Sequence, residues 1–253
     1  MRYRAEINAL IVKSTLKRQA KEYFLGLKRV KETTGYKSGR LDTSRLSSVM
    51  NRRVDVFKRK EDVRMVNSAV SILVDSSGSM SGECYALACA SAVMLAECLT
   101  AVGVQVEVAG FTEWSGNRLV HALHCQFGQR FNRAKTIDTM VELGDKLRQN
   151  ADGESIMVAY DRLIQVDTDK RVLIVLSDGG PCDDQMYDSE EVLREVCKFV
   201  ERDGKRTNTA LWGIGIGGST AVRRFYRNTV IVDDDNHIGD ALLTLIKQSV
   251  TVK

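Results

Sequence analysis

The sequence has few of the features that mark secreted, membrane or zinc-binding proteins. No stretch approaches the ~20 consecutive apolar residues that a membrane-spanning helix requires. Residues 1–6 lack the apolar core and the small-residue cleavage site of a secretory signal. The chain has 6 cysteines but no CxxC pair, which favours buried free thiols over a disulfide framework. We therefore expect a cytoplasmic protein that makes no membrane contact.

Motifs of the common enzyme and cofactor classes are also missing. The chain contains no Walker A sequence and no nucleophile elbow around a serine. His121 and His124 have the spacing of opposite faces of a strand, and His237 is distant, so no zinc set is expected. The glycines of residues 213–218 lie within and after a late apolar run, which argues against a dinucleotide-binding turn.

What the chain does contain is enough apolar sequence for a sizeable core, together with a separation of charge. Its 253 residues are 43% hydrophobic and 28% charged, values that favour one large or two small globular domains. Residues 1–60 hold 17 Lys and Arg against 5 Asp and Glu (+12), and the remainder holds 20 against 28 (−8). Such a basic arm binds nucleic acid or an acidic protein surface. Few interleaved aromatics and no nucleic-acid motif favour the protein contact, including one within the same chain.

The apolar periodicity changes character at residue 67. Residues 1–66 are expected to form a basic, mainly helical extension, with a break at 33–39 and an irregular arm or edge hairpin at 51–66. Residues 67–253 alternate strand and helix, which predicts a Rossmann-like α/β domain with a doubly wound, mostly parallel sheet. Strands are expected at 70–74, 104–111, 119–127 (an antiparallel edge), 171–176, 207–216 and 230–232, and helices at 82–102, 135–148, 155–165, 189–203 and 235–248.

Oxygen-bearing side chains gather where the first of these strands ends. The apolar run 70–74 leads directly into Asp75, which is followed by Ser77, Gly78 and Ser79. The strand brings Asp75 to the rim of the sheet, and the tight turn points both hydroxyls the same way. One charged and several neutral oxygens suit Mg²⁺, although a serine-rich helix cap has a similar composition. Neither serine has an evident general base, so nucleophilic catalysis is not expected.

Two later stretches have the same character. Asn150 to Ser155 precede a predicted helix, and Ser177 to Gly179 follow the apolar run 172–176. Because the carboxyl ends of parallel strands line one crevice, Asp75 and Asp178 are expected to reach the same edge of the sheet. The alternative interpretation, which the presence of all three stretches disfavours, is that Asp178 is a turn aspartate in the sequence Asp-Gly-Gly-Pro.

These three stretches, in this order, resemble the metal-ion-dependent adhesion site (MIDAS) of von Willebrand factor A (VWA) domains. Their amino-acid sequences are similar to the corresponding stretches in the C-terminal domain of the CobT subunit of aerobic cobaltochelatase. The similarity lies in residues 110–112, 150–154 and 177–184, and it extends over about residues 41–250.

The resemblance implies a set of ligands. Ser77 and Ser79 would bind the ion directly, and Asp75 and Asp178 directly or through water. The family usually supplies a threonine as the middle ligand, and this chain offers Asn150 or Asp152 instead. Three more acids would lie in the second layer around the ion or face a partner, unless they belong to solvated loops: Glu154, Asp183 and Asp184.

The resemblance also implies a function. The chain would be a docking subunit in which a partner's carboxylate completes the coordination of Mg²⁺, with Mn²⁺ or Ca²⁺ as alternatives. The implied partner is an AAA+ ATPase of the CobS or MoxR type, in an ATP-dependent cobaltochelatase or a related remodelling complex. The long acidic segment of CobT proteins is missing here, which weakens the chelatase role more than the ATPase partnership. A nucleic-acid-associated protein and a free-standing Mg²⁺ enzyme are the alternatives.

Overall fold

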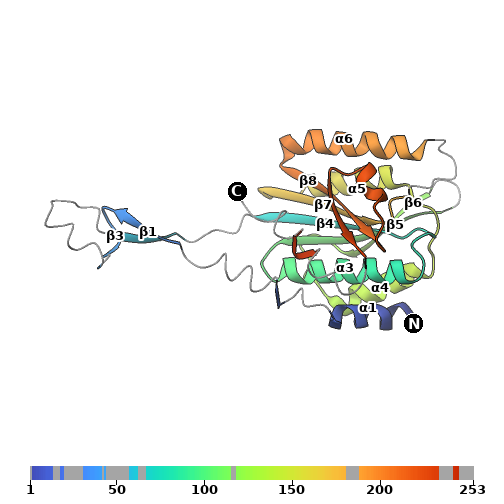
Figure 1. Cartoon of the computed structure of the whole chain (residues 1–253), viewed down its shortest axis with the longest axis horizontal. Coiled ribbons are helices and arrows are strands. Elements are labelled where there is room, and N and C mark those ends of the chain that lie inside the picture. Colours follow the sequence, from blue (N-terminus) through green and yellow to red (C-terminus); the bar gives the residue numbers. More distant parts are fainter. Residues whose placement is uncertain are drawn as a thin grey trace. The chain divides into compact units, whose positions relative to one another are not determined.

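The chain divides by its contacts into two compact units, residues 1–20 with 66–253, and residues 21–65. The computed structural model (Figure 1) describes residues 2–13, 18–19, 31–41, 43, 57–61, 67–114, 118–180, 188–233 and 242–244. The larger unit is built on a six-stranded sheet, and the smaller unit on a three-stranded antiparallel sheet.

The six-stranded sheet has the order β6-β5-β4-β7-β8-β9. All neighbouring pairs are parallel except β5 and β6, so the predicted antiparallel edge strand is confirmed. All eight residues of β4 are buried, as expected of a central strand covered on both faces. The strands are β4 (Ser68–Asp75), β5 (Gln105–Trp114), β6 (Arg118–Cys125), β7 (Lys170–Ser177), β8 (Thr209–Ile216) and β9 (Asn228–Val232).

Helices cover both faces of this sheet. Figure 1 shows α3 and α4 on one face and α5 and α6 on the other, which confirms the expected doubly wound α/β architecture. The helices are α3 (Glu83–Thr100), α4 (Arg133–Gly144), α5 (Asp152–Ile164), α6 (Ser189–Thr207) and the 3-10 helix η2 (Ala221–Arg224). The predicted last helix, 235–248, lies largely outside the described residues, of which 242–244 are helical.

Helix α3 is the most apolar of these elements. Glu83–Thr100 is long and apolar enough to cross a membrane, but 78% of it is buried inside the fold, as in the core helix of a globular domain. Its small residues, such as Ala88 and Ala92, permit close packing against the sheet. Cys89 and Cys98 are buried and belong to no disulfide among the described residues.

The N-terminal region differs from its sequence prediction. Helix α1 (Arg2–Lys13) packs on α3, where the Tyr3 ring meets the Tyr85 ring edge-on at 5.4 Å. The prediction of a mainly helical region 1–66 is wrong for residues 31–41, whereas the strand at residues 57–61 agrees with the edge hairpin expected within residues 51–66. The described part of residues 31–61 is a small antiparallel sheet. It consists of β1 (Lys31–Tyr36), β2 (Arg40–Leu41) and β3 (Phe57–Glu61), paired antiparallel in the order β1-β3-β2. Its threonines and aromatics favour strands over helix, a preference that the charged residues between them conceal.

Candidate metal-binding site

Asp75 stands at the middle of the carboxyl edge of the sheet. It is the last residue of β4, and it is fully buried. One carboxylate oxygen accepts a hydrogen bond from the Ser77 backbone N–H at 2.9 Å, and the other accepts one from the Ser177 hydroxyl at 2.9 Å. Ser177 ends the neighbouring strand β7, so Asp75 and the adjacent Asp178 reach the same edge, as the sequence predicts.

The turn after Asp75 is held by a second loop. The Ser77 and Ser79 hydroxyls lie 3.0 Å apart, so both serines point to one place. The backbone N–H of Gly78 donates to the carbonyl of Arg148. The Thr112 hydroxyl, at the end of β5, accepts from the Arg148 backbone N–H at 3.2 Å and donates to the carbonyl of residue 149 at 3.1 Å. These bonds bring the segment before Asn150 alongside the serine turn.

Asn150 bridges the acids of the site. Its side-chain amide donates to Asp152 at 2.7 Å, to the carbonyl of Gly180 at 3.1 Å and to Asp75 at 3.4 Å. The amide nitrogen is a donor only, whereas a cation requires the amide oxygen. In this arrangement the Asn150 amide connects two carboxylates, and Asp152 is the residue of this loop whose carboxylate could hold a cation.

Asp152 and Glu154 lie in the first turn of α5. Asp152 is buried and Glu154 is half-buried. Carboxylates are favoured at this position because the helix N-terminus carries a partial positive charge. The helix dipole offsets part of the cost of burying the Asp152 carboxyl group.

A strained glycine turn places Asp178. The residue is half-buried, and its side chain accepts from the Gly180 backbone N–H at 3.3 Å. Its carbonyl accepts from the Ser219 hydroxyl, which lies between β8 and η2. Gly179 has φ +79°, and a Cβ there would lie 2.7 Å from the backbone nitrogen of Val222. Only glycine fits this close approach of the two loops.

Two carboxyl groups of the site, those of Asp75 and Asp152, lie where their negative charge is disfavoured. Burial raises the pKa of Asp75 to about 6, and the nearby charge of Asp178 adds to this increase. Burial also raises the pKa of Asp152 well above its ordinary value, with further contributions from Asp75 and Asp178. Like charges brought together away from water are the condition that a divalent cation relieves.

The donors present fit a hard cation. Aspartate and serine oxygens are the ligands that Mg²⁺ prefers, and it commonly retains water in part of its shell. Among the described residues no group of three His, Cys, Asp or Glu side chains could hold a metal by itself, so the serine hydroxyls are needed to complete the set. Asp183 and Asp184 lie outside the described residues.

Two supporting residues were not among the predicted site residues. Ser177 donates to Asp75 and accepts from the Gly179 backbone N–H at 2.9 Å. Thr112 anchors the loop before Asn150. Both directly follow apolar stretches of predicted strands, and that position was the available signal.

His121 and His124 stay structural, as predicted. The Arg162 guanidinium donates to His121 at 3.2 Å while it forms an ion pair with the buried Glu107 at 3.0 Å. His124 bonds to Thr139 at 2.9 Å.

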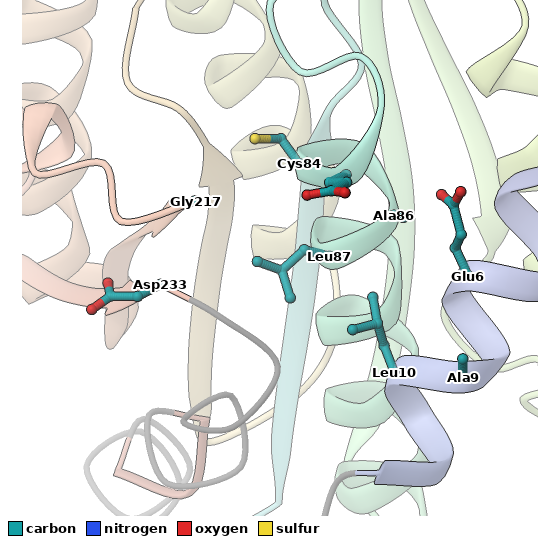
Figure 2. A pocket seen from close by; sticks show the side chains of 9 residues that line it. Glu6, Ala9, Leu10, Cys84, Ala86, Leu87, Gly217 and Asp233 are labelled. Carbon is teal, nitrogen blue, oxygen red and sulfur yellow. The ribbon is translucent and has the colours of Figure 1, made fainter.

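A hollow of about 630 Å³ is lined by α1, by the start of α3 and by the residues that follow β8 and β9 (Figure 2). Figure 2 shows Leu10 of α1 and Leu87 of α3 between two carboxylates, Glu6 and Asp233. Glu83 is a third acid in its lining. We call this space the acidic hollow.

A mostly parallel sheet with one antiparallel edge, whose carboxyl ends carry the three loops described above, defines a VWA domain. Residues 56–140 and 117–251 match the sequence family described as "Cobalamin biosynthesis protein CobT VWA domain". The chain therefore belongs to the CobT VWA-domain family.

Solved structures share the fold at low sequence identity. The PilB minor pilin from Streptococcus sanguinis is 13% identical, with a TM-score of 0.57, and the match covers 77% of this chain and 64% of that one. An aerotolerance-related membrane protein from Bacteroides fragilis is 14% identical, with a TM-score of 0.52 and coverage of 72% and 100%. The manganese-loaded TRAP protein of Plasmodium vivax is 15% identical, with a TM-score of 0.50 and coverage of 73% and 74%. This chain thus spans less than two thirds of the pilin.

Proposed function

We propose that this protein is a Mg²⁺-dependent docking subunit that partners an AAA+ ATPase of the CobS or MoxR type. Its membership of the CobT VWA-domain family supports a role related to cobalamin biosynthesis. The complex would be an ATP-dependent cobaltochelatase or a related remodelling assembly. In either case this chain supplies recognition, and the ATPase supplies the energy.

The observation that carries this proposal is the convergence of three loops on Asp75. The buried Asp75 carboxylate accepts hydrogen bonds from Ser77 and Ser177. The nearby charge of Asp178 raises the pKa of Asp75, and the charge of Asp75 raises the pKa of Asp152. These loops would hold the ion through oxygens on one side only. A bound Mg²⁺ would supply a fixed positive charge for a partner's carboxylate.

The rest of the chain's contribution is to hold these oxygens still. Thr112 and the Arg148 backbone fix the middle loop, and the Gly179 turn fixes the third. Preorganised loops lose little freedom when a partner docks, which favours affinity. The manganese-loaded TRAP protein has this fold, so Mn²⁺ belongs with Mg²⁺ and Ca²⁺ among the ions to be tested.

The test is co-precipitation of a purified CobS-type ATPase, with Mg²⁺ and with EDTA. Wild-type protein is expected to retain the ATPase only with Mg²⁺, and Asp75→Ala is expected to lose it in both conditions. Asp161→Ala, an exposed aspartate on the same helix as Asp152, is the matched control and should behave as wild type. Equal recovery of the ATPase by Asp75→Ala would contradict a metal-mediated contact.

The charge of residues 1–60, which is +12, favours one second candidate, a nucleic-acid-associated role. Such binding weakens steeply with salt because counterions are released. Retention of DNA or RNA by the full chain at low salt, lost when the lysines and arginines of residues 21–65 are neutralised, would support it.

A further inference from the structure

A second hollow, of about 460 Å³, is lined mainly by positively charged side chains, although the part of the chain that forms it has a negative net charge. Residues 61–253 have a net charge of −8, yet three cations line this hollow. We call it the basic hollow. Its lining consists of Trp114, Arg118, Asp145, Lys146 and Arg148.

The basic hollow adjoins the loops of the candidate metal site. Trp114 ends β5 and pairs with Arg118, the first residue of β6, so both lie at the carboxyl edge of the sheet. The carbonyl of Arg148 accepts from the backbone N–H of Gly78, in the serine turn. Arg148 also stands two residues before Asn150. One short segment therefore lines the hollow and enters the metal site.

The cations of the basic hollow have no ion-pair partner within the part of the chain that the structure describes. The ion pairs present there involve other residues, such as Arg162 with Glu107 and Arg206 with Asp203. Arg118, Lys146 and Arg148 are all exposed. Three like charges gathered without a partner repel one another, so folding stability does not account for them.

Trp114 is the second sign of a binding surface. It is 40% exposed, and it is one of few large apolar side chains so exposed among the described residues. Exposed tryptophan and arginine side chains are enriched in protein interfaces, where they carry much of the binding energy.

We propose that the basic hollow binds the acidic residues that flank the metal-bound carboxylate in the partner protein, with an apolar side chain of that segment resting on Trp114. This inference rests on the proposed docking function. A partner segment whose carboxylate sits on the ion would pass Arg148 next, and further acids would pair with Arg118 and Lys146.

An acidic protein segment suits this surface better than a nucleic acid. Asp145 lines the hollow itself, and Asp152 follows Arg148 by four positions in the segment that leads into the metal site. A continuous phosphate backbone would be repelled by these acids. A protein segment places its carboxylates singly, and one of them would reach the ion.

Fluorescence anisotropy with three labelled probes tests this inference. The first is a short peptide with a central aspartate, flanking glutamates and one phenylalanine, and the second replaces each glutamate by glutamine. The third is a single-stranded oligonucleotide of matched charge. Each probe is titrated with full-length protein in Mg²⁺ and in EDTA. The variants are Arg118→Glu combined with Arg148→Glu, Trp114→Ala and Asp75→Ala, and urea unfolding checks that each one folds.

Wild-type protein should prefer the glutamate peptide over the glutamine peptide by about tenfold at low salt, the sum of two exposed ion pairs near the upper end of their usual strength. The double charge reversal should abolish this preference and keep the Mg²⁺ dependence. Trp114→Ala should weaken both peptides equally. Arg130→Glu, an exposed arginine beyond the other end of β6, is the matched control and should change neither property.

The remaining outcomes separate this inference from the proposed function. If wild type binds both peptides equally, or the double variant keeps the preference, the inference is overturned. Tighter binding of the oligonucleotide through the same arginines would overturn it in favour of nucleic acid. A glutamate preference that depends on these arginines but not on Mg²⁺ or Asp75 would uphold the hollow and overturn metal-mediated docking.

Discussion

The two sides of the carboxyl edge of the sheet carry opposite charge. On the β7–β9 side lie Asp178, Asp233 and the acidic hollow, whose lining also includes Glu6 and Glu83. On the β5–β6 side lies the basic hollow, with its arginines and lysine around Trp114. Asp75, at the end of the central strand β4, stands between them.

This difference shows how one sheet edge can orient a partner. Under the proposed docking function, an acidic partner segment would be repelled from one side and attracted to the other, so its approach would be set before any metal contact forms. The two sides also differ in construction. The acidic side depends on close-packed glycine turns, whereas the charged side chains of the basic side project from a hairpin and a short loop into solvent. Changes on the first side should therefore affect stability, and changes on the second mainly binding.

The largest effect is expected on the acidic side, from Gly179→Ala. Its positive φ and the 2.7 Å approach of the new Cβ to the Val222 nitrogen should lower the free energy of unfolding by about 3 to 4 kcal/mol. Urea unfolding measures this loss. Gly180→Ala is the matched control, because among the described residues its Cβ would meet only Asp178, at 3.9 Å. Equal stability of the two variants would show that the Gly179 turn is not held in a close approach to the Val222 backbone.

The next effect is on the pH dependence of folding stability, and it comes from His124 in β6. The Thr139 hydroxyl donates to the carbonyl of Thr136 and so accepts from Nδ1–H of His124. The other ring nitrogen, Nε2, is buried and has no partner among the described residues. Burial lowers the pKa of His124 from 6.5 to about 4. The unfolded chain therefore takes up a proton first as the pH falls.

Stability should therefore be lost between pH 6.5 and 4, by up to about 3 kcal/mol from this residue. The raised pKa of Asp75 acts in the opposite direction in metal-free protein, so the test is a difference. His124→Gln should show a smaller loss than wild type when unfolding is measured in EDTA across this range. Parallel pH profiles for the two proteins would contradict a neutral buried imidazole.

An intermediate effect is expected at the centre, from Asp152→Asn. The variant keeps an oxygen that accepts from Asn150 but removes a buried carboxylate beside Asp75. In EDTA it should be more stable than wild type by about 1 kcal/mol, because unpaired buried charge is costly. In Mg²⁺ this order should reverse, because wild type alone gains the full stabilisation by the ion. Thermal unfolding in both buffers measures whether the order of stability of the two proteins reverses. The same order in EDTA and in Mg²⁺ would count against Asp152 as a ligand.

The smallest effect is expected beside the acidic hollow, from Tyr3→Phe. The Tyr3 hydroxyl accepts from the Gly82 backbone N–H at 3.1 Å, at the start of α3. Phenylalanine keeps the ring contact with Tyr85 and loses this bond, at a cost of about 0.5 kcal/mol, near the lower end for one hydrogen bond. Tyr3→Leu, which loses both contacts, should cost more. Identical urea midpoints for all three proteins would mean that α1 does not support this edge.

Much of the fold follows from the sequence because its sheet is buried on both faces. Short apolar runs such as 70–74 and 171–176 are typical of central strands that are covered on both faces. All the strands predicted after residue 67 are present. The small unit of residues 31–61 was harder to predict. Its strands are short and rich in charged residues, so the sequence there has no apolar periodicity to read.

The residues of the candidate site could be predicted from the sequence, but the hydrogen bonds between them could not. The spacing of Asp75, Ser77 and Ser79 identifies the first loop. That Asn150 offers its amide nitrogen to two carboxylates depends on a side-chain orientation that only the packing of three loops decides. The basic hollow likewise joins Arg118 and Arg148, thirty positions apart in the chain.

The most direct test of the account is calorimetric titration of the full chain with Mg²⁺, alongside Asp75→Ala. The account predicts saturable binding of a single ion by wild-type protein and no binding heat with Asp75→Ala, whose far-UV circular dichroism should match wild type. Undiminished Mg²⁺ binding by Asp75→Ala, or no binding by the folded wild type, would contradict the claim that the three loops hold a cation.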